Sequence, residues 1–327
     1  MFAQLMNWMR SRRMLPSISD TERQALEAGS VWIDGDFFRG KADFRALLEA
    51  PYSTLSEEEQ AFLDGPVEEL LGMIDRYQIG RTKRVPDDVV QFIKEQGFMG
   101  FLIPRQYGGK AFSTLAISTI LAKISPVCNT VGTLVVIPNS LGAAELIIHY
   151  GTQAQKDHYL PRLACGDYVP CFGLTELTAG SDAASVQATG EVCRDTDGEI
   201  RLRLNFRKRY ITLAPIANLC TIACSLHDPE QLLGRGKAPG ITCVMVRKGT
   251  PGFTSGEHHD PIGDPFYNGP LEGRDVVVPV DNIIGGAEDL INTCEGLGSF
   301  NFFNDGGLRR TFNVLWAGAE RNRSICF

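Results

Sequence analysis

The chain has 327 residues, a formal net charge of −7 and 43% hydrophobic residues, a composition typical of soluble proteins with two or three domains. The negative charge argues against nucleic acid as a general partner, and no apolar run reaches the ~18 residues that a membrane span requires. The nine cysteines include no CxxC pair. This disfavours a zinc site or a disulfide framework and favours a reducing, cytoplasmic compartment.

The first half of the chain predicts helices. Ser56 and Glu59 form a capping box ahead of an apolar pattern with helical spacing, and Thr152 with Gln155 forms a second capping box. A loop is predicted over residues 104–109, PRQYGG. The two capped helices are predicted to run from Ser56 to Ile74 and from Thr152 to Ala164. Further helices are predicted from Pro86 to Gly97 and over residues 113–124 and 141–150.

The second half predicts strands, because runs of β-branched and apolar residues alternate there with turn clusters. The tetrapeptide DTDG at residues 195–198 predicts a hairpin turn, and the polar segment 227–240 an exposed loop. Helices followed by strands favour an α+β fold over a parallel α/β sheet. Strands are predicted over residues 168–174, 185–193, 200–204, 209–213, 219–226, 241–247 and 274–279.

Familiar catalytic and metal-binding patterns are missing from the sequence. It contains no G-x-S-x-G elbow and no Walker loop, which disfavours a serine hydrolase and a P-loop nucleotide site. His258 and His259 are adjacent, and neighbouring side chains on an extended chain point to opposite faces. We therefore expect a solvated loop at these histidines and no metal site.

Two segments carry the positive evidence. The first is the loop CFGLTELTAGSD (residues 171–182), whose hydroxyls, glycine and backbone N–H groups could bind one anionic ligand. An ordinary β-turn is the alternative for this loop, and a generic strand is the alternative for the second segment, Tyr210–Thr212. Together they predict a flat ring held on a β surface. Tyr210 would lie against the ring, Thr212 would bond its edge, and Gly180 would admit a phosphate.

At these residues the chain resembles the acyl-CoA dehydrogenase family, whose hallmark is a TEP-x-AGSD loop followed by an aromatic-x-Thr strand. Here the hallmark reads TELTAGSD at residues 175–182 and YIT at residues 210–212. Further segments resemble the long bacterial branch used in fatty-acid β-oxidation. They follow in order between about Leu15 and Gly298: IPRQYGG, PNSLGAAELIIHYGT, QKDHYLPRLACGDYVPCFGLTE, KRYITLAP, DPEQLLG, GITC and DVVVPVDNIIGG.

The resemblance implies an N-terminal helical domain, a middle β-barrel domain and a C-terminal helical bundle around FAD. In this chain the resemblance fades after Gly298, in a segment without clear periodicity, so we expect the bundle to be missing. The predicted division is an N-terminal extension (1–50), a helical domain (51–166), a β-barrel domain (167–285) and an atypical tail (286–327). The hallmark proline is replaced by Leu177, which is expected to loosen the loop.

The resemblance also implies roles for single residues. The expected FAD-binding residues are Phe172, Leu174, Thr175, Gly180, Ser181, Tyr210 and Thr212. Ser181 is also expected to contact the acyl-CoA. The family's catalytic glutamate is expected in the missing C-terminal domain, so no catalytic base is assigned in this chain, and no metal is expected.

The implied function is FAD-dependent α,β-dehydrogenation of fatty acyl-CoA to trans-2-enoyl-CoA. An electron-transfer flavoprotein would be the acceptor, and a homo-oligomer is an open expectation. The location is expected to be cytoplasmic, with peripheral attachment to the inner membrane left open. The alternatives are an inactive truncated dehydrogenase that acts at most as a flavin or acyl-CoA binder and, less favoured, an unrelated α+β hydrolase. For this chain alone we expect weak FAD binding and no detectable turnover.

Overall fold

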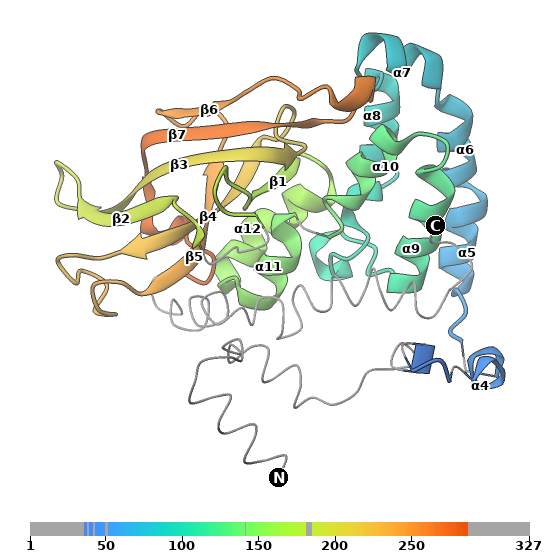
Figure 1. Cartoon of the computed structure of the whole chain (residues 1–327), viewed down its shortest axis with the longest axis horizontal. Helices are drawn as coiled ribbons and strands as arrows, with labels where there is room; N and C mark the ends of the chain where they lie inside the picture. The colour runs from blue at the N-terminus through green and yellow to red at the C-terminus, as the bar shows by residue number, and fades with distance from the viewer. Residues whose placement is uncertain are drawn as a thin grey trace.

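The structure is a computed structural model that describes residues 36–37, 39–41, 43–49, 52–140, 142–180 and 185–286 (Figure 1). Helices occupy the first part of this range and strands the second, which confirms the α+β prediction. The helices are α4 (Phe44–Leu48), α5 (Glu57–Asp64), α6 (Pro66–Met73), α7 (Arg76–Thr82), α8 (Asp87–Glu95), α9 (Thr114–Ile124), α10 (Asn129–Val136), α11 (Ala143–Tyr150) and α12 (Gln153–Ala164).

Both predicted capping boxes are present, at the N-termini of α5 and α12. The helix predicted from Ser56 to Ile74 is two helices, because Gly65 leaves the helical region (φ −107°, ψ −91°) and Pro66 opens α6. Helices α4, α7 and α10 were not predicted. In α10, the run NTVGTLVV is buried on nearly all sides, so it shows no amphipathic period.

Seven strands form one curled sheet: β1 (Pro170–Gly173), β2 (Thr189–Arg194), β3 (Ile200–Thr212), β4 (Leu219–His227), β5 (Gly240–Arg247), β6 (Phe253–Ser255) and β7 (Asn268–Pro279). The order is β1-β4-β2-β3-β7-β6, and β5 pairs with β4. A single antiparallel bridge from Glu176 to Lys208 joins the chain after β1 to β3, so the path β1-β4-β2-β3 curls back on itself.

The two strands predicted over residues 200–204 and 209–213 are one long strand, β3. The polar segment between them continues the alternation of the strand: Asn205 and Arg207 are exposed, whereas Phe206 and Lys208 are buried. Strand β2 begins at Thr189, later than predicted, and the three-residue strand β6 was not predicted. The predicted hairpin turn at residues 195–198 connects β2 to β3, with Gly198 at φ 84°.

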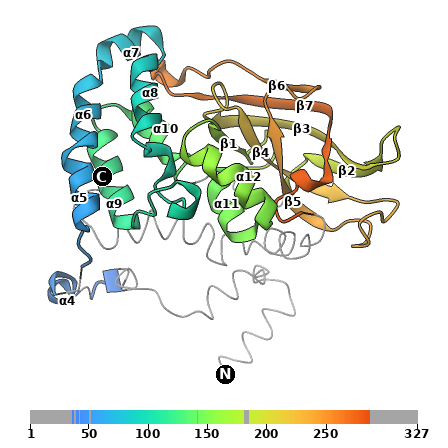
Figure 2. The same cartoon turned by 180° about the vertical axis from the view of Figure 1, so that it is seen from behind.

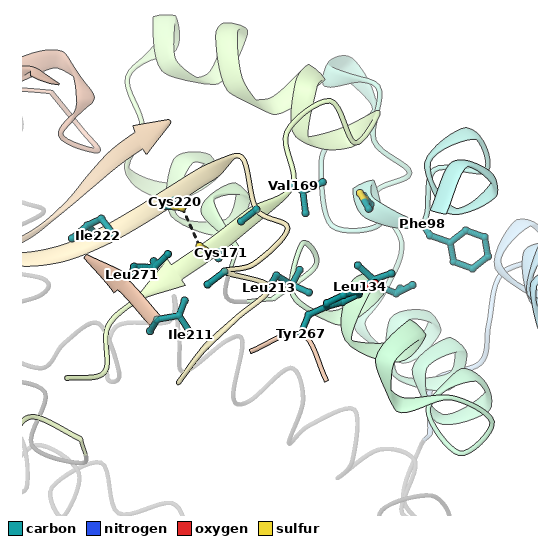
Figure 3. Close-up of a cluster of buried hydrophobic side chains, with 14 of the residues drawn as sticks. Phe98, Leu134, Val169, Cys171, Ile211, Leu213, Cys220, Ile222, Tyr267 and Leu271 are labelled. Atoms are coloured by element: carbon teal, nitrogen blue, oxygen red, sulfur yellow. Dashed lines mark hydrogen bonds between the residues drawn. The ribbon is translucent and has the colours of Figure 1, made fainter. Parts of the chain in front are cut away.

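Helices α11 and α12 cover one face of β1, β4 and β5, and the remaining helices stand beside the sheet (Figures 1 and 2). The inner face of the sheet and the helices share one apolar cluster (Figure 3), which includes Cys171, Leu213, Leu134 and Phe98. The thiols of Cys171 and Cys220 meet at 3.2 Å within it, and this hydrogen bond, together with burial, raises the pKa of Cys171. The seven cysteines of the described segments are free thiols.

None of the helices in the described part of the chain is long and apolar enough to cross a membrane. Most of the predicted N-terminal extension (1–50) and all of the predicted atypical tail beyond residue 286 lie outside the described residues.

Glu59 links α5 to α9 and generates a test of the helical domain. Its carboxylate accepts hydrogen bonds from the backbone N–H groups of Ser56 (2.8 Å) and Ser113 (2.6 Å). Burial raises the pKa of this carboxyl, but these hydrogen bonds outweigh it and hold the pKa below its ordinary value. The stabilisation is therefore present above the unfolded-state pKa and disappears as the pH falls through the lower folded-state pKa.

We expect Glu59→Ala to lower the free energy of unfolding by about 1–2 kcal/mol at pH 7, since two backbone donors lose their acceptor. The deficit should shrink in acid, where the wild-type chain loses the same stabilisation. Urea unfolding at pH 7 and near pH 3 measures both, and Glu57→Ala, at an exposed position of the same turn, is the control. A deficit that stays constant with pH would contradict this account.

Candidate functional site

The predicted site loop includes β1 and the turn after it. The residues of β1 point alternately to the two faces of the sheet. Cys171 and Gly173 face the interior of the barrel, whereas Phe172 and Leu174 lie on the opposite face, because side chains alternate along a strand. There, Phe172 and Leu174 are half-buried against the apolar cluster that α11 and α12 form with β4 and β5. The structure thus places the first two predicted site residues together on one face.

The loop itself is a tight turn. The N–H of Glu176 donates to the carbonyl of Ala179 (2.9 Å), and Leu177 at its tip is 69% exposed. Gly180 is exposed, and a Cβ placed on it would meet no atom of the described, non-adjacent residues within 4 Å. Space for an external group therefore lies beside this backbone. Ser181, with residues 182–184, lies outside the described residues, so its predicted role stays a prediction.

Glu176 and Lys208 form a buried ion pair that fastens this loop to β3. Their side chains are 4% and 0% exposed, and the Lys208 Nζ lies 2.6 Å from the Glu176 Oε1. The same ammonium donates to the carbonyl of Leu174 (3.1 Å). Burial lowers the pKa of Lys208, and the carboxylate only partly offsets this. The N–H of Arg209 donates to the carbonyl of Thr175 (3.0 Å), directly beside the pair.

A β-bulge sets the direction of Tyr210 and Thr212. Lys208 pairs with Leu271 of β7 and Ile211 with Gly269, so β3 has one residue more than β7 between these pairs. The extra residue shifts the alternation: Lys208 and Ile211 both point inward, whereas Tyr210 is 53% exposed and Thr212 half-buried. Together with the Thr175–Arg209 hydrogen bond, the bulge brings the two predicted segments side by side.

Tyr210 is framed by two side chains that the sequence did not indicate as site residues. The guanidinium of Arg209 lies 4.2 Å from the ring centroid and donates to the Tyr210 hydroxyl. The His259 ring meets Tyr210 edge to face at a centroid distance of 5.1 Å. The solvated loop expected at His259 is wrong for this residue. Its ring is partly buried, and its Nε2 atom is buried with no hydrogen-bond partner among the residues that the structure describes.

The two adjacent histidines contact different tyrosines. His259 contacts Tyr210, whereas the ring of His258 lies at a centroid distance of 5.1 Å from the ring of Tyr267. Within the described residues, no group of histidine, cysteine, aspartate and glutamate side chains could hold a metal ion. The sequence signal that could have identified Lys208 is its place at an inward position of an alternating strand. His259 lies 49 residues after Tyr210, and the sequence holds no comparable signal for it.

The surface at the bulge fits a planar, polar ligand such as a flavin. It offers an exposed aromatic ring, a threonine hydroxyl on the same face and, among the described residues, open space beside Gly180. A helical domain followed by a curled β domain, with a site of this kind at the end of β1, is a fold that several known proteins share.

Two family models match the chain. The acyl-CoA dehydrogenase N-terminal domain matches residues 55–167, and the acyl-CoA dehydrogenase middle domain matches residues 171–276. Together they cover most of the described residues, in the order the family uses. The chain belongs to the acyl-CoA dehydrogenase family, an oxidoreductase family, which confirms the resemblance in the sequence.

Curated relatives agree with this assignment. An acyl-CoA dehydrogenase of Bacillus subtilis is 32% identical over 183 residues, which cover 56% of this chain and 45% of the relative. A probable acyl-CoA dehydrogenase of Mycobacterium tuberculosis is 30% identical over 254 residues, which cover 76% of this chain and 37% of the relative. The chain thus spans about half or less of the length of these relatives.

Solved structures share the fold. Butyryl-CoA dehydrogenase from Megasphaera elsdenii has a TM-score of 0.65 at 23% identity, covering 82% of this chain and 67% of that chain. A glutaryl-CoA dehydrogenase in complex with glutaryl-CoA has a TM-score of 0.63 at 25% identity, covering 81% and 64%. An acyl-CoA dehydrogenase from Bacillus anthracis complexed with FAD has a TM-score of 0.59 at 22% identity, covering 84% and 45%.

Tyr210 is in the left-handed backbone region, with φ 57°, which a residue with a side chain rarely adopts. Such strain costs on the order of 1 kcal/mol and is concentrated at functional positions. We expect Tyr210→Asn to leave the free energy of unfolding unchanged or to raise it by up to about 1 kcal/mol, because asparagine tolerates this region. Chemical unfolding measures the change.

Tyr77→Asn is the matched control, since Tyr77 is 73% exposed but belongs to helix α7. Its replacement relieves no strain, so a small loss of stability is expected. Tyr210→Asn would contradict the prediction if it destabilised the chain by more than about 2 kcal/mol, as the loss of a core residue does.

Proposed function

We propose that this chain is the flavin-holding part of an enzyme that introduces an α,β double bond into a fatty acyl-CoA thioester. Family membership supports the oxidoreductase class. The observation that supports a flavin site is the pairing of the loop after β1 with the bulge on β3, which puts Thr175 and Tyr210 side by side. The similar structures include dehydrogenases of butyryl-CoA and glutaryl-CoA, and a fatty acyl-CoA is the substrate class that we propose here.

In this proposal Phe172, Leu174 and Thr175 line one side of the isoalloxazine, and Tyr210 and Thr212 line another. Gly180 and Ser181 would meet the phosphates, and Ser181 would also meet the acyl-CoA. The FAD-bound structure of the similar Bacillus anthracis enzyme supports this cofactor. Bound FAD would supply the acceptor for the hydride that leaves the β-carbon. Loop and bulge orient the ring and exclude water from one of its faces.

The remaining parts of the proposal concern the rest of the reaction. A carboxylate must take the α-proton, and we place it in the family's C-terminal helical domain and not at the buried, ion-paired Glu176. Electrons would pass to an electron-transfer flavoprotein. The enzyme would act in the cytoplasm, and both peripheral attachment to the inner membrane and assembly with further copies of itself stay open in this proposal.

FAD titration of the purified 327-residue chain, followed by flavin fluorescence, tests the cofactor. We expect weak but saturable binding. Replacing Thr212 with valine should weaken it about fivefold, which corresponds to the loss of one hydrogen bond of ~1 kcal/mol. Thr254→Val, at an exposed position of β6, is the control and should bind FAD as the wild type does. The absence of saturable binding would overturn the proposal.

Anaerobic addition of palmitoyl-CoA or butyryl-CoA to the FAD-loaded chain tests where the base lies. We expect the visible flavin band to persist, because the proposal assigns no base to the described residues. Rapid bleaching by either substrate would show that the chain carries its own base, and a preference for palmitoyl-CoA would identify the long-chain class.

A further inference from the structure

The buried carboxylate of Glu176 is bound from three directions. Its oxygens accept hydrogen bonds from the Lys208 ammonium (2.6 Å) and from the backbone N–H groups of Gln187 (2.6 Å) and Ala188 (3.0 Å). Lys208 in turn donates to the carbonyl of Leu174 (3.1 Å). One ion pair therefore holds three segments: the loop after β1, the approach to β2, and β3 at its bulge.

The pair is placed where both halves of the candidate site begin. Thr175 directly precedes Glu176, and Tyr210 follows Lys208 by two residues. Between them, the Arg209 N–H donates to the Thr175 carbonyl (3.0 Å). A shift of the loop relative to β3 would thus change the spacing between Thr175 and the outward face of Tyr210 and Thr212.

Stability alone is a weak reason for such a pair. Removing two charges from water costs several kcal/mol per ion, and apolar pairs of similar volume are often as stable. The surroundings of Lys208 are otherwise apolar or thiol-bearing: Ile222 and Leu271 lie against the adjacent Gly173, and the Cys224 and Cys243 thiols are close enough to act on its charge. What an apolar pair could not reproduce is the hydrogen bonding to the backbone groups of Leu174, Gln187 and Ala188.

We propose that Glu176 and Lys208 are positioning residues for the cofactor: their ion pair fixes the loop after β1 against the β3 bulge at the separation that the flavin ring requires. This inference rests on the proposed FAD site and extends it to two residues that do not face the ring. Neither residue touches the reacting atoms, so both act through Thr175, Tyr210 and Thr212.

The test compares two ion pairs of the same barrel. In Glu176→Leu/Lys208→Met an apolar pair replaces the charges but not the backbone hydrogen bonds. The matched control is Asp195→Leu/Arg201→Met. There, a carboxylate likewise binds one cation (2.8 Å) and two backbone N–H groups, those of Asp197 (2.9 Å) and Glu199 (3.0 Å), but in the β2–β3 turn. Both double variants remove a carboxylate–cation pair and the acceptor of two backbone donors, and the control additionally removes the pairing of Arg201 with the exposed Glu199.

We expect the Glu176/Lys208 double variant to bind FAD at least tenfold more weakly and to lose the fine structure of the bound flavin's visible spectrum. The control should keep the wild-type affinity and spectrum, even where its thermal midpoint falls as far. Amide hydrogen exchange should accelerate at Gln187, Ala188 and Arg209 only in the first variant. Because that variant could fail to fold, Glu176→Gln is measured beside it, and it should bind FAD with intermediate affinity.

Equal FAD affinity in all variants, or affinity losses that follow only the loss of thermal stability, would overturn the positioning role while leaving the proposed function intact. A wild-type chain that binds no FAD would overturn the proposed function and the positioning role together. Accelerated amide exchange without any change in FAD affinity or in the flavin spectrum would refute the positioning role alone, because the loop would then move without consequence for the flavin.

Discussion

The structure of the β domain depends on the burial of the Lys208 ammonium group. Because this side chain is 0% exposed, its charge needs an opposite charge and hydrogen-bond acceptors in direct contact with it. The requirement explains several residues at once. Glu176 supplies the opposite charge and Leu174 supplies a carbonyl, while Gly173 leaves space for the Ile222 side chain next to the lysine stem. A Cβ on Gly173 would lie 2.9 Å from Ile222 and 3.4 Å from Lys208. The loop after β1 takes its path from this demand.

The bulge on β3 turns the side chains at the end of this strand outward, where they can contact a ligand. A regular strand would have turned Tyr210 and Thr212 to the inside with Lys208. The extra residue leaves Ile211 to fill the core and directs both polar side chains outward. The cost is a strained backbone at Tyr210 and again at Leu213, with φ 57° and 65°. The Leu213 N–H donates a hydrogen bond to the backbone carbonyl of Tyr267 (2.7 Å), which holds the C-terminal end of the bulge.

What could be predicted from the sequence was local. Capping residues such as Ser56 and Thr152 act within one turn of their helices, and strand runs such as residues 219–226 need only their own residues to be recognised. The bulge is different, because it exists only in the register of β3 against β7, about sixty residues apart in the chain. The contact between Glu176 and Lys208 and the contact of His259 with Tyr210 are tertiary for the same reason, so sequence periodicity could not indicate them.

A buried polar side chain also fixes the segment that follows β7, and in this case the side chain belongs to helix α12. The Gln155 amide on α12 donates to the carbonyls of Asp281 (2.8 Å) and Ile283 (2.7 Å) and accepts from the Gly285 N–H (3.1 Å). Ile284 is thereby held in the apolar cluster against which Phe172 and Leu174 pack. The last described residues therefore end on the side of the sheet that carries the first two predicted flavin contacts.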